Sequence, residues 1–279
     1  MPIRRGWLIV AFLSLWLPCT ATAAEERPLW EAGAGVGVLN MPEYRGSDER
    51  RWVVLPYPYL IYRGDILRVE RERISGRLFQ TDRVLLDFSF NGSIPVDSGK
   101  NTARSGMPDL DPTFEVGPSL NVKLWEGSEE AWRLNLFLPL RALFSTDFST
   151  VRHEGWVFHP QLVFEKRDLI PQSGLSLGIS AGPFFADSGY HRYFYEVEPA
   201  YARATRPAYA AGGGYSGSKL SVGLSKRVGP VIISAFVSVD WLQGAAIADS
   251  PLVKRETSVM TGMSLSWVFF SSKQKAADR

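Results

Sequence analysis

Segments of about ten residues, in which apolar and polar side chains alternate, recur along most of this chain. From Val231 to Trp241, for example, every odd position is apolar, and Ser234, Ser238 and Asp240 lie between them. Alternation with a period of two is typical of β-strands that have one apolar face. After residue 24 no apolar run reaches the roughly 18 residues that a membrane helix needs. The pattern therefore predicts an all-β protein.

The first 24 residues have the pattern of a secretory signal peptide. Arg4 and Arg5 precede an apolar stretch at 7–17, and small residues follow at 21–24. The apolar stretch is too short to cross about 30 Å of hydrocarbon, which argues against a membrane anchor; a buried helix is the other alternative. We expect cleavage after Ala23 or Ala24. Cys19, the only cysteine, would leave with the signal peptide, so the mature chain would form no disulfide.

An exported all-β chain can be a soluble sandwich or an outer-membrane barrel. A sandwich points its apolar faces inward, whereas a barrel points them at lipid and carries aromatic girdles at both membrane margins. Two features favour the barrel. The positions that alternate with the apolar residues are rich in Gly, Ser and charged residues, and aromatic residues cluster at strand ends. The predicted girdle consists of Trp30, Trp52, Trp132, Trp156, Trp241, Trp267 and Phe269.

The alternation and the turn residues predict a transmembrane antiparallel up-and-down β-barrel over residues 25–270. Its connections alternate between short turns, expected in the periplasm, and longer external loops. We expect a polar periplasmic tail at 271–279 and pairing of the last strand with the first. If the charged stretch at 65–80 is not two strands, ten strands replace twelve. The twelve expected strands are 29–40, 51–62, 65–71, 74–80, 83–95, 112–124, 131–144, 154–166, 174–185, 217–227, 230–241 and 256–269.

Charged residues of both signs occupy the polar positions of the alternation, which face the interior of such a barrel. Mixed signs favour pairing across a plugged or narrow interior over a wide diffusion pore. The net charge of +2 gives no argument for a nucleic-acid partner. The predicted lumen charges are Glu115, Lys123, Arg133, Arg141, Glu165, Arg227 and Asp240.

The sequence offers little for catalysis or for binding a metal or cofactor. His159 lies on the inward parity beside Gln161, but serines are so common that a Ser–His pair by chance is expected. Asp109 and Asp111 could contribute oxygen ligands to a hard cation, but turn capping explains them better. We therefore expect no catalytic, cofactor-binding or metal-binding residues.

Four segments in this order resemble the MipA/OmpV family of Gram-negative outer-membrane proteins, the MltA-interacting protein family. They are "PEYRGSDER" (42–50), "LPYPYLIYRGD" (55–65), "DLDPTFEVGPSL" (109–120) and "YFYEVEPAYARATRPAYAAGGGYSG" (193–217). The resemblance covers almost the whole mature chain. Two departures weaken transfer of a particular partner: family members commonly stop at the terminal aromatic residue, and "YFYEVEP" differs from the usual pattern in the long loop.

The resemblance implies a monomeric, non-enzymatic barrel in outer-membrane lipid. It also implies a scaffold between a lytic murein transglycosylase and a bifunctional peptidoglycan synthase. The alternatives are a narrow channel for small solutes and a lipid-acting barrel enzyme that uses His159.

Overall fold

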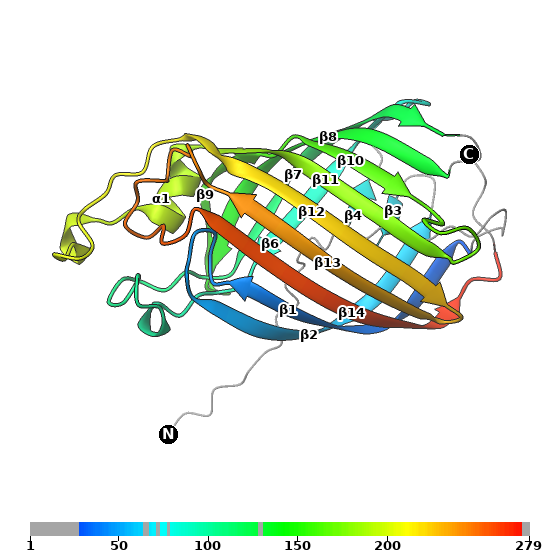
Figure 1. Cartoon of the computed structure of the whole chain (residues 1–279), viewed down its shortest axis with the longest axis horizontal. Helices are drawn as coiled ribbons and strands as arrows, with labels where there is room; N and C mark the ends of the chain where they lie inside the picture. The colour runs from blue at the N-terminus through cyan, green and yellow to red at the C-terminus, as the bar shows by residue number, and fades with distance from the viewer. Residues whose placement is uncertain (1–27, 64–66, 71–72, 77–78, 128–130, 275–279) are drawn as a thin grey trace, which may run out of the picture.

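The computed structural model describes residues 28–63, 67–70, 73–76, 79–127 and 131–274. They form one antiparallel sheet, whose strands wrap around a common axis in Figure 1. The strands are β1 (Trp30–Pro42), β2 (Arg50–Arg63), β3 (Leu67–Glu70), β4 (Arg73–Gly76), β5 (Phe79–Gln80), β6 (Val84–Ser93), β7 (Thr113–Glu126), β8 (Trp132–Thr146), β9 (Val151–Phe158), β10 (Gln161–Lys166), β11 (Leu175–Ala186), β12 (Gly214–Val228), β13 (Val231–Trp241) and β14 (Thr257–Ser271).

In the described part of the chain, three short helices lie in the connections between strands. They are α1 (Ser188–Tyr195) and the 3-10 helices η1 (Ser98–Lys100) and η3 (Pro199–Tyr201). Asp187 caps α1, because its carboxylate accepts a hydrogen bond from the backbone of Tyr190. Among the described residues, no helix is both long and apolar enough to cross a membrane.

The first and last strands of the chain pair with each other. β14 runs antiparallel to β1, with Met263 opposite Val38, which confirms the expected pairing. The strand order has β4 at one end and β5 at the other, and these two strands are consecutive in the chain. Residues 77–78 between them lie outside the described part. The strand order therefore begins and ends at two strands that are consecutive in the chain, as an up-and-down topology requires.

Every predicted strand span overlaps at least one observed strand. The predicted strand 154–166 is divided into β9 and β10 at Pro160, although both keep one register with β8. The register of β11 with these two strands places Pro160 opposite Pro183. Neither residue has a backbone N–H, so no ladder hydrogen bond can join them and the strand is interrupted. The span 65–80 holds β3, β4 and β5, but the predicted reversal near 71–73 lies partly outside the described residues.

Long and short connections lie at opposite ends of the strands. Figure 1 shows α1 and the long loops together at one end, and short turns at the other. The two ends of the described chain meet at the short-turn end, where Leu29 N donates to Gln274 O at 2.8 Å. β14 ends at Ser271, two residues beyond the expected strand 256–269, so the first residue of the expected tail belongs to the strand. We call the two ends the loop end and the turn end.

Candidate functional site

The outward face of the sheet is apolar and carries the predicted girdle residues. Trp52, Trp156 and Trp241 lie toward the loop end, and the other four lie toward the turn end. Trp52 is 73% exposed, and all of the set are exposed except Trp132, which is partly so. Two bands of exposed rings around an apolar surface are the arrangement expected of a protein surrounded by lipid.

The opposite face of the wall carries a buried ion pair between two predicted lumen charges. Arg141 Nε lies 2.7 Å from Glu115 Oε2, and the two side chains are only 6% and 7% exposed. Arg141 also donates to Ser89 Oγ, and Asn91 donates to Glu115. Two charges held this way fix side chains in the interior, because breaking the pair would leave an uncompensated buried charge.

Four other predicted lumen charges lie near the turn end, where Lys123, Arg133 and Arg227 form ion pairs. Glu126 accepts from Lys123 Nζ and from Arg133 Nε, both at 2.7 Å. Arg227 Nη1 lies 2.6 Å from Glu31, whose side chain is 1% exposed. The group of four is Lys123, Arg133, Arg227 and Glu165, the last partly exposed on β10.

The long loops pack together into a cap over the loop end. Tyr44, Tyr195, Leu242, Ile247 and Leu252 form a shared apolar cluster, and each is at most 6% exposed. Tyr44 Oη donates to Leu252 O at 2.9 Å, which links the β1–β2 loop to the β13–β14 loop. The loops are therefore a packed layer, drawn around α1 in Figure 1.

Arg45 joins this loop cap to the barrel wall. Its Nε lies 2.9 Å from Asp240, the seventh predicted lumen charge, and its Nη2 donates to Ser216 O at 2.9 Å. The guanidinium lies 4.4 Å from the centre of the Phe184 ring. Tyr195 Oη donates to Arg45 O, and burial raises the pKa of Tyr195 to about 12. Sequence reasoning missed Arg45, because a loop position carries no alternation that would point it inward.

His191 and Ser216 form a serine–histidine pair that sequence reasoning also missed. His191 Nδ1 lies 2.5 Å from Gly212 O and donates to it, so Nε2 accepts from Ser216 Oγ at 2.9 Å. This orientation resembles that of a nucleophile and its base. Both residues are fully buried, however, and Arg45 Nη1 also approaches Ser216 Oγ at 3.4 Å. The hydroxyl is shielded from solvent in this structure, and the pair packs α1 against β12.

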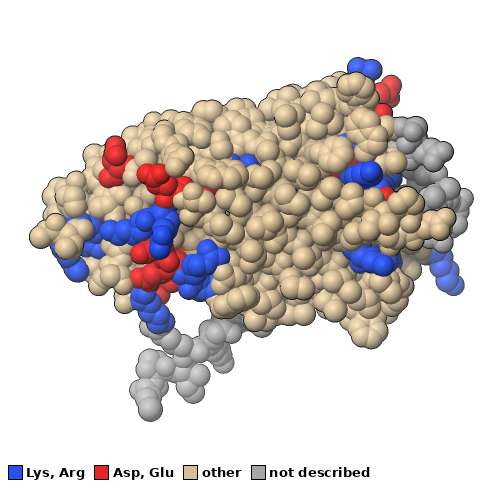
Figure 2. Space-filling view, viewed as in Figure 1, with Lys and Arg blue, Asp and Glu red and all other residues tan. Residues whose placement is uncertain are grey.

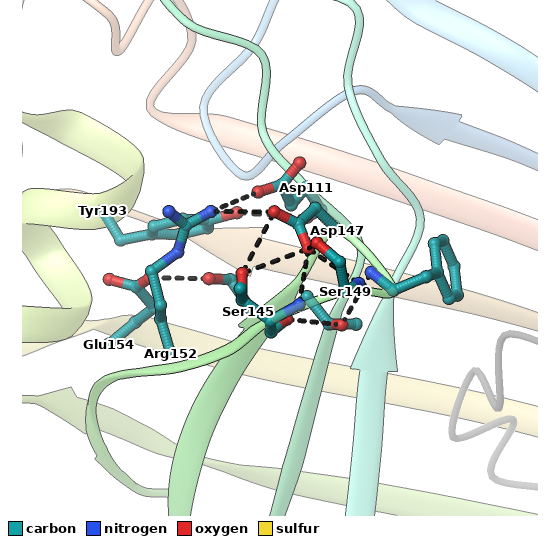
Figure 3. Close-up of polar contacts among 10 residues, drawn as sticks. Asp111, Ser145, Asp147, Ser149, Arg152, Glu154 and Tyr193 are labelled. Carbon is teal, nitrogen blue, oxygen red and sulfur yellow. Dashed lines mark hydrogen bonds and ion pairs between the residues drawn. The ribbon is translucent and has the colours of Figure 1, made fainter.

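Acidic side chains hold the β8–β9 loop in its conformation through hydrogen bonds and ion pairs (Figure 3). Asp147 accepts hydrogen bonds from the hydroxyl and backbone groups of Ser149 and Thr150, and these hold its pKa well below the usual range. Arg152 Nη2 lies 3.1 Å from Asp111 and 3.9 Å from Asp147. Within the part that the structure describes, no group of three or more His, Cys, Asp or Glu could hold a metal ion.

The chain matches the family described as "MltA-interacting protein MipA" over residues 34–269. It belongs to the MipA family. One curated relative is the outer membrane protein Omp26La of Vibrio anguillarum. It is 24% identical over 214 residues, which cover 75% of this chain and 76% of the relative. This MipA-family chain is an outer-membrane β-barrel protein.

Solved structures that are similar to this MipA-family chain include a bacterial polysaccharide outer membrane secretin. It gives a TM-score of 0.42 at 9% identity and covers 86% of this chain and 99% of that one. The COG4313 outer membrane channel from Pseudomonas putida F1 also gives 0.42, at 12% identity, over 89% of this chain and 100% of that one.

Proposed function

We propose that this chain is a non-enzymatic, monomeric scaffold of the outer membrane. Its apolar outward face would contact lipid, and its turn end would bind peptidoglycan-remodelling enzymes in the periplasm. One candidate is a murein transglycosylase, in keeping with the description of the family as MltA-interacting. The other is a peptidoglycan synthase.

The observation that carries the proposal is the filled interior. Glu115, Arg141 and Asp240 are almost fully buried on the inward face, and so are many inward serines. The lumen of a wide diffusion porin would leave such polar groups in water, because water fills it. The loop cap adds a packed apolar layer across one end. A filled and capped barrel is suited to presenting its ends to partners.

The turn end offers a surface for such a partner. Ile170, in the connection between β10 and β11, is 60% exposed. An apolar side chain at a connection tip, beyond the apolar band, gains free energy if a partner covers it. At the loop end, Ala204 is exposed in the protruding segment between η3 and β12 and provides a matched position.

The test is site-specific photo-crosslinking in living cells. A photoreactive residue at Ile170 should cross-link to a murein transglycosylase or a peptidoglycan synthase, identified by mass spectrometry. The same residue at Ala204 should not. Absence of these enzymes from the Ile170 adducts, or equal recovery from both positions, would refute the scaffold.

A further inference from the structure

The inward face of β12 carries a cation that no carboxylate of the described residues neutralises. Lys219 lies directly opposite Asp240 in the β12–β13 ladder. Asp240, however, is bound to Arg45 at 2.9 Å. In the described part of the chain, Lys219 forms no ion pair, and its side chain is only partly buried. Asp240 would be the natural ion-pair partner of Lys219 across the two strands, but it pairs with Arg45 of the loop cap instead.

One glycine lies between Lys219 and the strand formed by β9 and β10. On its other side Lys219 pairs with Gly182 of β11, and the register places Gln161 of β10 next. Adjacent strands are about 4.8 Å apart, and Gly182 has no side chain to block the inner surface. The flexible four-carbon stem of Lys219 can therefore extend along the wall toward Gln161 and its neighbour His159.

His159 presents a buried donor to the same region. Gln161 Nε2 donates to His159 Nδ1 at 3.1 Å, so the ring proton is on Nε2. Among the described residues, His159 Nε2 has no hydrogen-bond partner, and the residue is 7% exposed. A buried N–H without an acceptor costs free energy, which a ligand oxygen would recover.

The charges around His159 sum to a single surplus positive charge. The cations that act on it are Lys219, Arg141 and Arg45. Arg141 is neutralised by Glu115 at 2.7 Å, and Arg45 by Asp240. Of these three cations, Lys219 alone has no carboxylate partner among the described residues.

We propose that Lys219 and His159 bind a small monocarboxylate inside the barrel, beneath α1. The ammonium of Lys219 neutralises the ligand, and His159 Nε2 donates a hydrogen bond to one of its oxygens. The Phe184 ring, whose centre is 5.2 Å from that of His159, provides an apolar contact for the alkyl part. A dianion such as sulfate would leave one buried negative charge without a partner, so the site favours single charges. This binding activity is separate from the scaffold role.

Acetate is the probe for this site. The mature chain, refolded in deuterated detergent near pH 7, is titrated with acetate at constant ionic strength, and saturation transfer to the acetate methyl group is measured by NMR. Wild type should give a saturable signal that an equal concentration of sulfate displaces poorly. Lys219→Gln should weaken acetate binding at least fivefold. Lys226→Gln, an exposed position on the same strand, should leave binding unchanged.

Heat-modifiable gel mobility establishes that each variant is folded. If Lys219→Gln does not fold, Lys219→Arg should keep binding and His159→Leu should weaken it. A wild-type signal that does not saturate overturns the proposal. So does acetate binding that survives both Lys219→Gln and His159→Leu. Neither result affects photo-crosslinking from Ile170, so this site and the scaffold can fail separately.

Discussion

At the residue scale, Arg45 explains why the loops form an ordered cap. One side chain binds Asp240 of β13, the backbone of Ser216 in β12 and the ring of Phe184 in β11. The backbone carbonyl of Arg45 accepts from Tyr195 in α1. A loop residue that contacts three strands and a helix fixes the position of the loop over the interior. Its guanidinium can do this because it offers five donors in a planar fork.

Replacing Arg45 should destabilise the folded barrel. Arg45→Met removes the charged hydrogen bond to Asp240 and leaves Lys219, opposite in the ladder, to neutralise that carboxylate, which should lower the free energy of unfolding by about 2 kcal/mol. Urea denaturation in lipid vesicles, followed by tryptophan fluorescence, measures the change. Adding Asp240→Asn should recover part of the loss. Arg50→Met, at an exposed site, should cost less than about 0.5 kcal/mol. Equal losses for Arg45→Met and Arg50→Met would contradict this role.

His191 should make the stability of the cap depend on pH. Burial lowers its pKa in the folded chain, with the nearby Arg45 acting in the same direction and the hydrogen bond to Gly212 opposing it. The unfolded chain therefore binds the proton more readily. The neutral ring gives full stability above about pH 6.5, and stability falls as the pH drops from there through the lower folded value.

The measurement for His191 is the temperature of heat modification between pH 7.5 and pH 5. Wild type should lose stability toward the acid side, and His191→Gln should flatten that part of the profile. The same slope in both proteins would assign the acid sensitivity to other groups.

At the element scale, the sequence predicts the strands well and the loops poorly. Period-two alternation locates β13 and its inward residues, because the two faces of a wall meet different surroundings. The seven charges chosen by parity include the buried pair Glu115–Arg141 for the same reason. Loop residues such as Arg45 and His191 have no such periodicity, since tertiary contacts alone decide where they point. The break at Pro160 could have been found from the facing Pro183, but only once the register was known.

Gly182 should be essential where β11 approaches β10. A Cβ there would collide with the carbonyl group of Pro160 and the backbone of Gln161. Gly182→Ala should therefore force the strands apart and destabilise the barrel by about 1–3 kcal/mol. Gly37→Ala is the matched control, because its Cβ would meet nothing nearer than 3.8 Å. Urea denaturation measures the free energy of unfolding of both variants. Equal values would show that the strands can move apart at Gly182 without loss of stability.

The end of β14 should matter for assembly more than the residues after it. Trp267 and Phe269 are 52% and 56% exposed on the outward face, so lipid would cover them. Trp267→Ala and Phe269→Ala should each lower the heat-modifiable fraction. Truncation after Phe270 removes the pairing of Ser271 with Glu31 and the bond from Ser272 to Trp30, and should leave assembly intact. Normal assembly of both point variants would show that this strand is misread.

At the scale of the whole molecule, one wall meets three different surroundings. Its outward face is apolar with rings at both ends, its inward face is lined with serines and ion pairs, and its loop end is covered by a packed cap. Charged side chains gather at the two ends of the visible surface in Figure 2, and the middle is almost free of them. Lipid can therefore surround the middle, while the two ends remain available to water and to partners.

The filled interior predicts that the protein does not conduct ions. Refolded wild type in a planar bilayer should give no stepwise conductance, because inward polar side chains such as the pair Glu115–Arg141 are buried and the cap covers the loop end. A porin inserted in the same bilayer is the positive control for recording. Antibody detection of the barrel in the recovered membrane would confirm that it inserted. Reproducible current steps from wild type would instead show a continuous water path, and would favour the narrow-channel alternative over the scaffold.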